Sequence, residues 1–163
     1  MVRQTAEGWS KPRLLHADGW KIAGCPVNGP QADGRGKHVA VAWFTAAAER
    51  GRAYVAFSED AGASFGKPIV VDDGQPVGRV DVVMLDSDTA VATWSEQTAS
   101  GAELRARRVP RNGEPSPSVK VADSSAARAA GFARAAVVGE DVYIAWTEQT
   151  AVTKRIHVSR VRL

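Results

Sequence analysis

A tryptophan-centred segment recurs three times in the chain at nearly constant spacing. The segments are HVAVAWFTAAAE, TAVATWSEQTA and DVYIAWTEQTA, and their residues Trp43, Trp94 and Trp146 lie 51 and 52 positions apart. A second mark, a proline leading into a short apolar run, recurs at Pro12, Pro68 and Pro117. Two marks that keep one period indicate a repeated structural unit of about 50 residues.

The sequence between these marks is typical of short β-strands separated by turns. It alternates or runs apolar, is rich in Val, Ala and aromatic residues, and is punctuated by Gly and Asp. SSAARAAGFARAA is rich in alanine, but Gly131 and the lack of an apolar face favour a loop over a helix. A unit of about 40 to 50 residues made of strands is typical of a propeller blade. The predicted fold is all-β, a partial β-propeller of about three four-stranded antiparallel blades.

These blades divide a single predicted domain, residues 1–163. The predicted units span residues 17–72, 73–122 and 123–163. Strands are predicted at residue 31 (weakly), 38–44, 52–58, 68–72, 80–85, 89–95, 103–109, 118–122, 132–138, 141–147 and 155–163. A further strand, at 12–16, is predicted to belong to a preceding blade or to close the third blade or a neighbouring molecule's blade.

Composition and charge exclude several classes of protein. The chain is 44% hydrophobic and 24% charged, which is ordinary for a globular domain. Its net charge of +3 comes from scattered residues without a basic stripe, so no nucleic-acid partner is expected. Cys25 is the only cysteine, which excludes an internal disulfide and a cysteine-based zinc cluster. No membrane span, signal-peptide stretch, cofactor motif or metal-ligand spacing is present, and no cofactor or metal is predicted.

The segment AFSEDAGASFGKPIVV carries a regular set of turn residues. Ser58, Asp60, Gly62, Ser64 and Phe65 fit the pattern S-x-D-x-G-x-[ST]-[FW]. The Asp and Ser side chains can bind the backbone of their own turn, and Gly adopts conformations closed to other residues. We therefore predict a structural turn between the third and fourth strands of a blade, with no catalytic role for its aspartate. The segment TAEGWSKP keeps only the aromatic residue and the proline of this turn.

Five residues on the opposite rim are candidates for ligand binding. Arg79 and Arg134 precede apolar innermost strands at corresponding positions of two successive units, so their guanidinium groups could converge on one anion such as a carboxylate. The alternative is that they are ordinary arginines pairing with nearby acids such as Asp81. Asn28 could offer its amide to a sugar hydroxyl or close a local turn. Trp20 could stack on a sugar ring or fill the space between blades.

The sequence also carries a resemblance to a known family. The turn pattern from Ser58 to Phe65 resembles the Asp box of sialidase-type propellers. With the fifty-residue period and the segments DGWKIAGCPVNGP, GRVDVV and GFAR, it makes the chain, from about residue 8 to 162, resemble bacterial sialidase-like proteins with BNR (Asp-box) repeats. The resemblance implies a six-bladed propeller that holds a sialic acid carboxylate with three arginines, two of them Arg79 and Arg134. It also implies an aspartate acid/base and a tyrosine nucleophile activated by glutamate. The Phe-Arg-Ile-Pro motif is missing and neither Tyr54 nor Tyr143 begins an innermost strand, so no nucleophile is assigned.

The expected function follows from that resemblance. It is a sialidase-like propeller segment that binds, and in complete form hydrolyses, terminal sialic-acid-type glycosides. The alternatives are a non-catalytic glycan- or protein-binding propeller and a purely structural module, in which the repeated Glu96 and Glu148 are also structural. Three blades make half of a six-bladed ring and leave apolar flanks open. The chain is therefore expected to be a fragment of a longer parent, the favoured reading, or to form a homodimer. The family implies a periplasmic or secreted protein.

Overall fold

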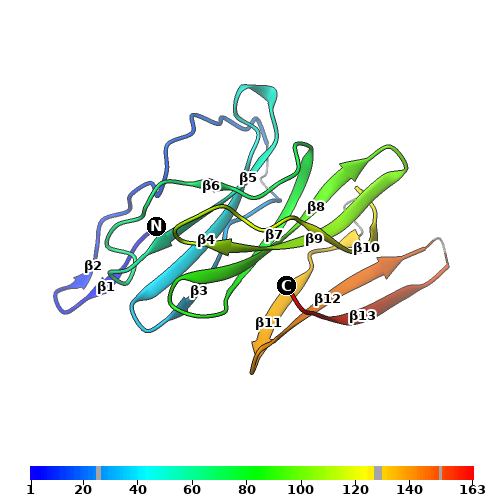
Figure 1. Cartoon of the computed structure of the whole chain (residues 1–163). Coiled ribbons are helices and arrows are strands. Elements are labelled where there is room, and N and C mark those ends of the chain that lie inside the picture. Colours follow the sequence, from blue (N-terminus) through cyan, green and yellow to red (C-terminus); the bar gives the residue numbers. More distant parts are fainter. Residues whose placement is uncertain (25–26, 127–129, 151) are drawn as a thin grey trace.

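The computed structural model describes residues 1–24, 27–126, 130–150 and 152–163, and it is built from antiparallel β-strands (Figure 1). No α-helix occurs in these four stretches, so the prediction of an all-β protein is confirmed. A single turn of 3₁₀ helix, η1 (Ala47–Glu49), joins two of the strands. Cys25 and residues 127–129 of the predicted SSAARAAGFARAA loop lie outside the described residues.

Three of the sheets are meanders of consecutive strands. The first sheet contains β3 (Gln31–Arg35), β4 (His38–Thr45), β5 (Arg52–Ser58) and β6 (Ile69–Val70). The second sheet contains β7 (Pro76–Met84), β8 (Thr89–Thr98), β9 (Gly101–Pro110) and β10 (Val119–Ser124). The third sheet contains β11 (Arg134–Val138), β12 (Asp141–Gln149) and β13 (Lys154–Val161). A small hairpin of β1 (Gln4–Thr5) and β2 (Gly8–Trp9) precedes them.

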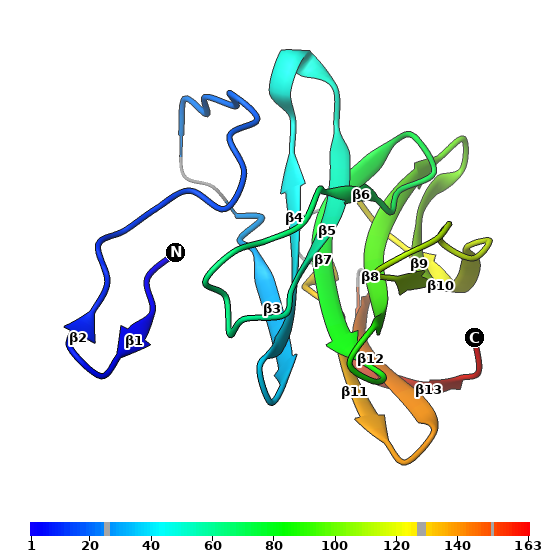
Figure 2. The same ribbon diagram turned by 60° about the vertical axis from the view of Figure 1, so that its left-hand side comes forward.

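Strands form at every predicted position from residue 31 onward, with ends that differ by a few residues. The strand predicted at 12–16 is wrong, because these residues form no strand. A strand needs a partner edge, and the open edge of the third sheet, β13, lies at the opposite end of the molecule (Figures 1 and 2). Instead, the Arg13 N–H donates to the Met1 carbonyl at 3.0 Å, and its guanidinium donates to the Gly62 carbonyl at 2.8 Å.

The three meander sheets stack in chain order, so the second sheet lies between the first and the third (Figure 2). Side chains alternate across a strand, and β8 uses both of its faces. Ala92 and Trp94 pack toward the first sheet, whereas Val91 packs toward the third. β8 is therefore buried on both faces from Ala90 to Glu96, its polar residues Thr93 and Ser95 included.

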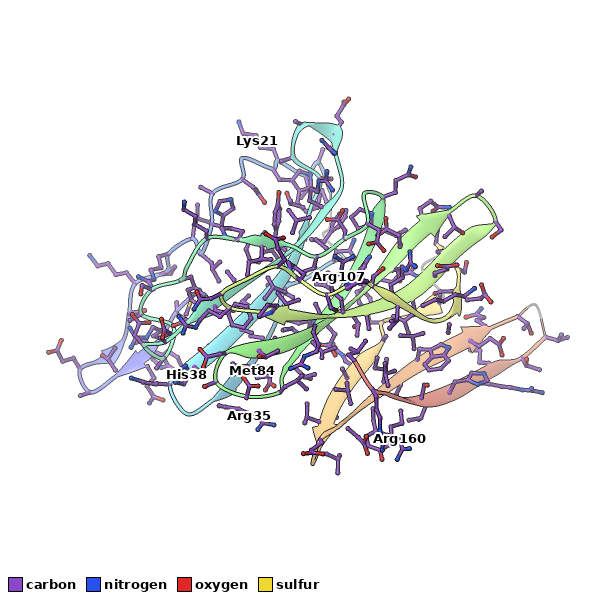
Figure 3. The ribbon with its side chains drawn as sticks, in the orientation of Figure 1. Lys21, Arg35, His38, Met84, Arg107 and Arg160 are labelled. Carbon is purple, nitrogen blue, oxygen red and sulfur yellow. The ribbon has the colours of Figure 1, made fainter. Side chains whose placement is uncertain are left out.

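Trp94 anchors the contact between the first and second sheets. Its side chain is fully buried, and its indole N–H donates to the Glu96 carboxylate (Oε2) at 2.6 Å. The guanidinium carbon of Arg107 lies 5.1 Å from the ring centre, an arrangement that allows a cation–π interaction. In Figure 3, Arg107 and the buried Met84 lie over the middle of the stack, and Lys21, Arg35 and Arg160 lie at its periphery.

The same carboxylate fixes the loop that enters β7. Glu96 is buried and accepts hydrogen bonds from the backbone N–H groups of Asp73, at 3.2 Å, and Gln75, at 2.5 Å. Buried carboxylates are stable only when their oxygens are bound in this way. Its repeat counterpart Glu148 is exposed and contacts His157 at 3.0 Å. The two glutamates of the repeated motif therefore have different environments.

The buried indole donor yields a prediction about stability. Trp94→Phe removes the donor from the buried Glu96 carboxylate, so we expect the free energy of unfolding to fall by about 1–3 kcal/mol. The matched change Trp43→Phe affects a half-buried ring at the same repeat position and should cost less. Urea denaturation measures both values. Equal losses in the two variants would contradict the role assigned to the indole hydrogen bond.

The Asp-box turn connects β5 to β6, where the sequence predicts it. The Ser58 hydroxyl accepts from the Gly62 N–H at 2.8 Å and donates to Asp60 Oδ1 at 2.8 Å. Asp60 also accepts from the Ser64 N–H at 2.8 Å and from its hydroxyl at 2.6 Å. Gly62 has a φ of 77°, which favours glycine. The turn residues bind one another, as expected of a structural element.

Hydrogen bonds from Ser64, and then from Ser58, hold the pKa of Asp60 well below its ordinary value of 3.8. A lowered pKa stabilises the fold above pH 3.8, and this contribution is lost as pH falls through the folded-state value. We expect Asp60→Asn to destabilise the protein at pH 7 and to lessen the loss of stability between pH 4 and pH 2. Thermal denaturation at several pH values checks this. Parallel pH profiles for the two proteins would contradict it.

Candidate functional site

One register position of the first strands of the three meander sheets brings three polar side chains together. Gln31 in β3, Asp81 in β7 and Arg134 in β11 each lie opposite the residue that precedes the repeated tryptophan. Those opposing residues are Ala42, Thr93 and Ala145. The repeat therefore places these three side chains at one level of three successive sheets. We call Gln31, Asp81 and Arg134 the inner-strand cluster.

Arg134 links the members of this cluster. Its Nη1 donates to Gln31 Oε1 at 2.5 Å and lies 3.4 Å from Asp81 Oδ1. The arginine side chain is 57% exposed, whereas Asp81 is buried. Residues from three strands thus hold one guanidinium group at the surface, where it can meet a ligand.

Asp81 also joins the second sheet to the third. Its Oδ2 accepts a hydrogen bond from the Ala135 N–H at 2.7 Å. Burial raises the pKa of Asp81, while the N–H groups of Ala135 and Val82 and the charge of Arg134 oppose that rise. The carboxylate therefore orients Arg134 and fixes the strand that carries it.

Arg79 does not correspond to Arg134, so that part of the prediction is wrong. Arg134 matches Asp81 in register, and Arg79 lies in a bulge of β7 with a φ of 55°. The Arg79 residue is only 6% exposed. Its Nη1 and Nη2 donate to the carbonyls of Ser125, at 2.5 Å, and Ala126, at 2.9 Å. This guanidinium group holds the chain beyond β10 in place, and the predicted convergence of two arginines on one anion does not occur.

Asn28 fixes the same bulge. Its Oδ1 accepts from the Arg79 N–H at 3.1 Å, and its Nδ2 donates to the Val77 carbonyl at 3.1 Å. Gly78 between them has a φ of 97°, and a Cβ added there would lie 2.4 Å from Asn28 Nδ2. The amide is therefore bound to a distant strand and not to a local turn, while its contact with a sugar stays a prediction.

Trp20 lies at the wall of a cavity of about 520 Å³ that Val41 and Trp43 also line. Its ring meets Phe44 edge to face, with centroids 5.7 Å apart. Its backbone N–H donates to Asp18 Oδ1 at 3.0 Å. Gln31 pairs with Ala42, which packs toward the second sheet, so the inner-strand cluster lies on the other face of the first sheet from Trp43. The structure therefore does not bring Trp20 together with Arg134.

Sequence reasoning missed Gln31 because its strand is short and its polar residues give a weak pattern. Counting cross-strand pairs from the repeated tryptophans would have found Gln31. Gln31 pairs with Ala42, just before Trp43, as Asp81 pairs with Thr93, just before Trp94. The same count would have separated Arg79 from Arg134. The bulges between Pro76 and Asp81 hide this count in the sequence.

Other chemistry is not assembled in the part of the chain that the structure describes. These residues contain no group of three or more His, Cys, Asp or Glu side chains able to hold a metal ion. Among these residues, no helix is long and apolar enough to cross a membrane. Neither a protein-family model, nor a curated protein, nor a solved structure matches the chain. Function is therefore inferred from the geometry of the inner-strand cluster.

The two arginines are expected to differ sharply in their effect on stability. Arg79→Ala removes a charged donor from two backbone carbonyls, so the free energy of unfolding should fall by about 1.5–3 kcal/mol. Arg134→Ala removes a longer contact, 3.4 Å, from the buried Asp81 carboxylate, which keeps the Ala135 N–H, so the loss should be smaller, about 1 kcal/mol or less. Chemical denaturation of the two variants tests the assignment. A larger loss for Arg134→Ala would overturn it.

Proposed function

We propose that the chain is a partial β-propeller of about three blades, half of a six-bladed sialidase-type ring, that binds an acidic glycan. Meander sheets stacked in chain order and an Asp-box turn between third and fourth strands support the propeller part. The inner-strand cluster supports the binding part. On this proposal, β3, β7 and β11 are the innermost strands of the three blades.

The observation that carries the proposal is the exposed guanidinium group of Arg134, held by side chains from two other sheets. Gln31 and Asp81 both meet its Nη1. A guanidinium group binds a carboxylate best through two parallel N–H donors, and Nε with Nη2 offers such a pair. Holding the arginine in advance lowers the entropy cost of binding.

A terminal sialic acid presents a carboxylate on its pyranose ring. This carboxylate is the group that the exposed guanidinium of Arg134 would bind.

The proposal is for binding, because the described residues do not supply a complete hydrolytic set. Arg79 is engaged by backbone carbonyls, and Asp81 binds Arg134 and the Ala135 N–H. Tyr54 packs against Trp43, with ring centroids 5.5 Å apart, away from the inner-strand cluster. Hydrolysis would belong to a complete ring with further residues. This favours the non-catalytic glycan-binding alternative for the chain by itself.

Calorimetric titration with the α-methyl glycoside of sialic acid tests the proposal. We expect Arg134→Ala to weaken binding by about tenfold or more, since one charge-assisted pair contributes about 1.5–3 kcal/mol. Arg160→Ala is the matched control, because Arg160 is an exposed arginine at the periphery of the third sheet (Figure 3). This variant should bind like the wild type.

A second ligand separates recognition of the carboxylate charge from nonspecific binding of a sugar. Methyl galactoside has a pyranose ring but no carboxylate, so it should bind far more weakly than the sialoside. Equal binding of the two glycosides, or unchanged sialoside affinity in Arg134→Ala, would refute the assignment of Arg134.

A further inference from the structure

The third sheet exposes a face that the other two sheets bury. Val55, Ala106 and Val158 occupy one register position, each opposite the residue before the repeated tryptophan. Val55 and Ala106 are 0% exposed, because the next sheet covers them, whereas Val158 is 64% exposed. The repeat therefore builds the same apolar face three times and covers it only twice.

A second register position gives the same result. Ala53, Leu104 and Ile156 are equivalent, since they pair with the residues that follow the tryptophans. Their exposed fractions are 0%, 3% and 79%. Two exposed β-branched side chains on one face of a sheet mark a surface that is suited to another sheet.

Within the described residues, the third sheet has three strands, β11, β12 and β13. In the first and second sheets, a fourth strand, β6 or β10, pairs with the third strand. Among the described strands, β13 pairs with β12 alone, so its other edge is open. An open edge presents unpaired backbone groups that can bind an added strand.

Residues 12–16 have the sequence of a fourth strand but no strand partner. The segment follows Trp9-Ser10-Lys11-Pro12, just as β6 follows Phe65-Gly66-Lys67-Pro68. In the first and second sheets the fourth strand leads into the first strand of the next sheet, and residues 12–16 likewise lead toward β3. Leu14 is among the most exposed large apolar residues. The segment lies at the opposite end of the molecule from β13 (Figures 1 and 2).

We propose that a second copy of this chain completes the third sheet. Residues 12–16 of one copy leave the outer face of the first sheet, where His16 lies beside Trp43, and add to the β13 edge of the other copy. The Trp43 face that they uncover packs on the exposed face around Ile156 and Val158. This contact repeats the packing of the Trp94 face on the first sheet. Two identical contacts related by a twofold axis cover both ends of both copies and close the dimer. The proposal does not depend on glycan binding, so either can fail alone.

Light scattering on a size-exclusion column tests the oligomeric state. We expect a mass of about 35 kDa, twice the 17.3 kDa of one chain. Ile156→Asp and Val158→Asp should shift the protein to a monomer with an unchanged circular dichroism spectrum, since both side chains are exposed in the single chain. Val152→Asp changes an exposed valine outside β13 and should leave the dimer intact. A monomer at every concentration, or a dimer that survives both face variants, would overturn the proposal.

Disulfide trapping tests the strand pairing itself. In a Cys25→Ser background, chains carrying Leu14→Cys or Leu15→Cys are mixed with chains carrying Ile156→Cys or His157→Cys. These choices cover both faces of each strand, and neighbouring strands bring facing Cα atoms within disulfide distance. At least one mixture should give a crosslinked heterodimer on a non-reducing gel. If no mixture crosslinks while the wild type is dimeric, a different surface forms the dimer and the proposal is wrong.

Discussion

Each meander sheet of this chain has two faces to bury, and most of the structure follows from that constraint. The second sheet meets it by lying between the other two, with Trp94 packed on one side and Val91 on the other. The first sheet packs its outer face partly against the N-terminal segment, around His16 and Trp43. The third sheet leaves its outer face open. The stack is therefore well packed in its middle and incomplete at its ends.

Carboxylates on the first strands of the meander sheets set how one sheet sits on the next. Asp33 accepts from the Met84 N–H at 2.8 Å, which ties β3 to β7. Asp81 accepts from the Ala135 N–H at 2.7 Å, which ties β7 to β11. Because Asp81 also contacts Arg134, the residue that aligns the second and third sheets also orients the candidate binding residue. Fold and site share this residue, so the position of Arg134 is as precise as the sheet packing.

The sequence was sufficient where local pattern decides the structure. Three tryptophan segments predicted β4, β8 and β12, and the polar pattern from Ser58 predicted the turn before β6, because both depend on nearby residues. It was insufficient where a distant partner decides. Residues 12–16 have a strand sequence but no edge to join, and Asn28 binds backbone groups at residues 77 and 79. The equivalence of Arg79 and Arg134 failed because a bulge shifts the residue count in β7.

The inner-strand cluster shows how a repeat can carry a site. The frame around it repeats, since each member lies opposite the residue before a tryptophan. The members themselves do not repeat: Gln31 is neutral, Asp81 acidic and Arg134 basic. Three identical charges at this position would repel one another, whereas an amide and a buried carboxylate leave the arginine exposed and held in place. A binding site on a repeated fold requires different side chains at the position where the repeats meet. The strands around that position can still pack alike in all three units.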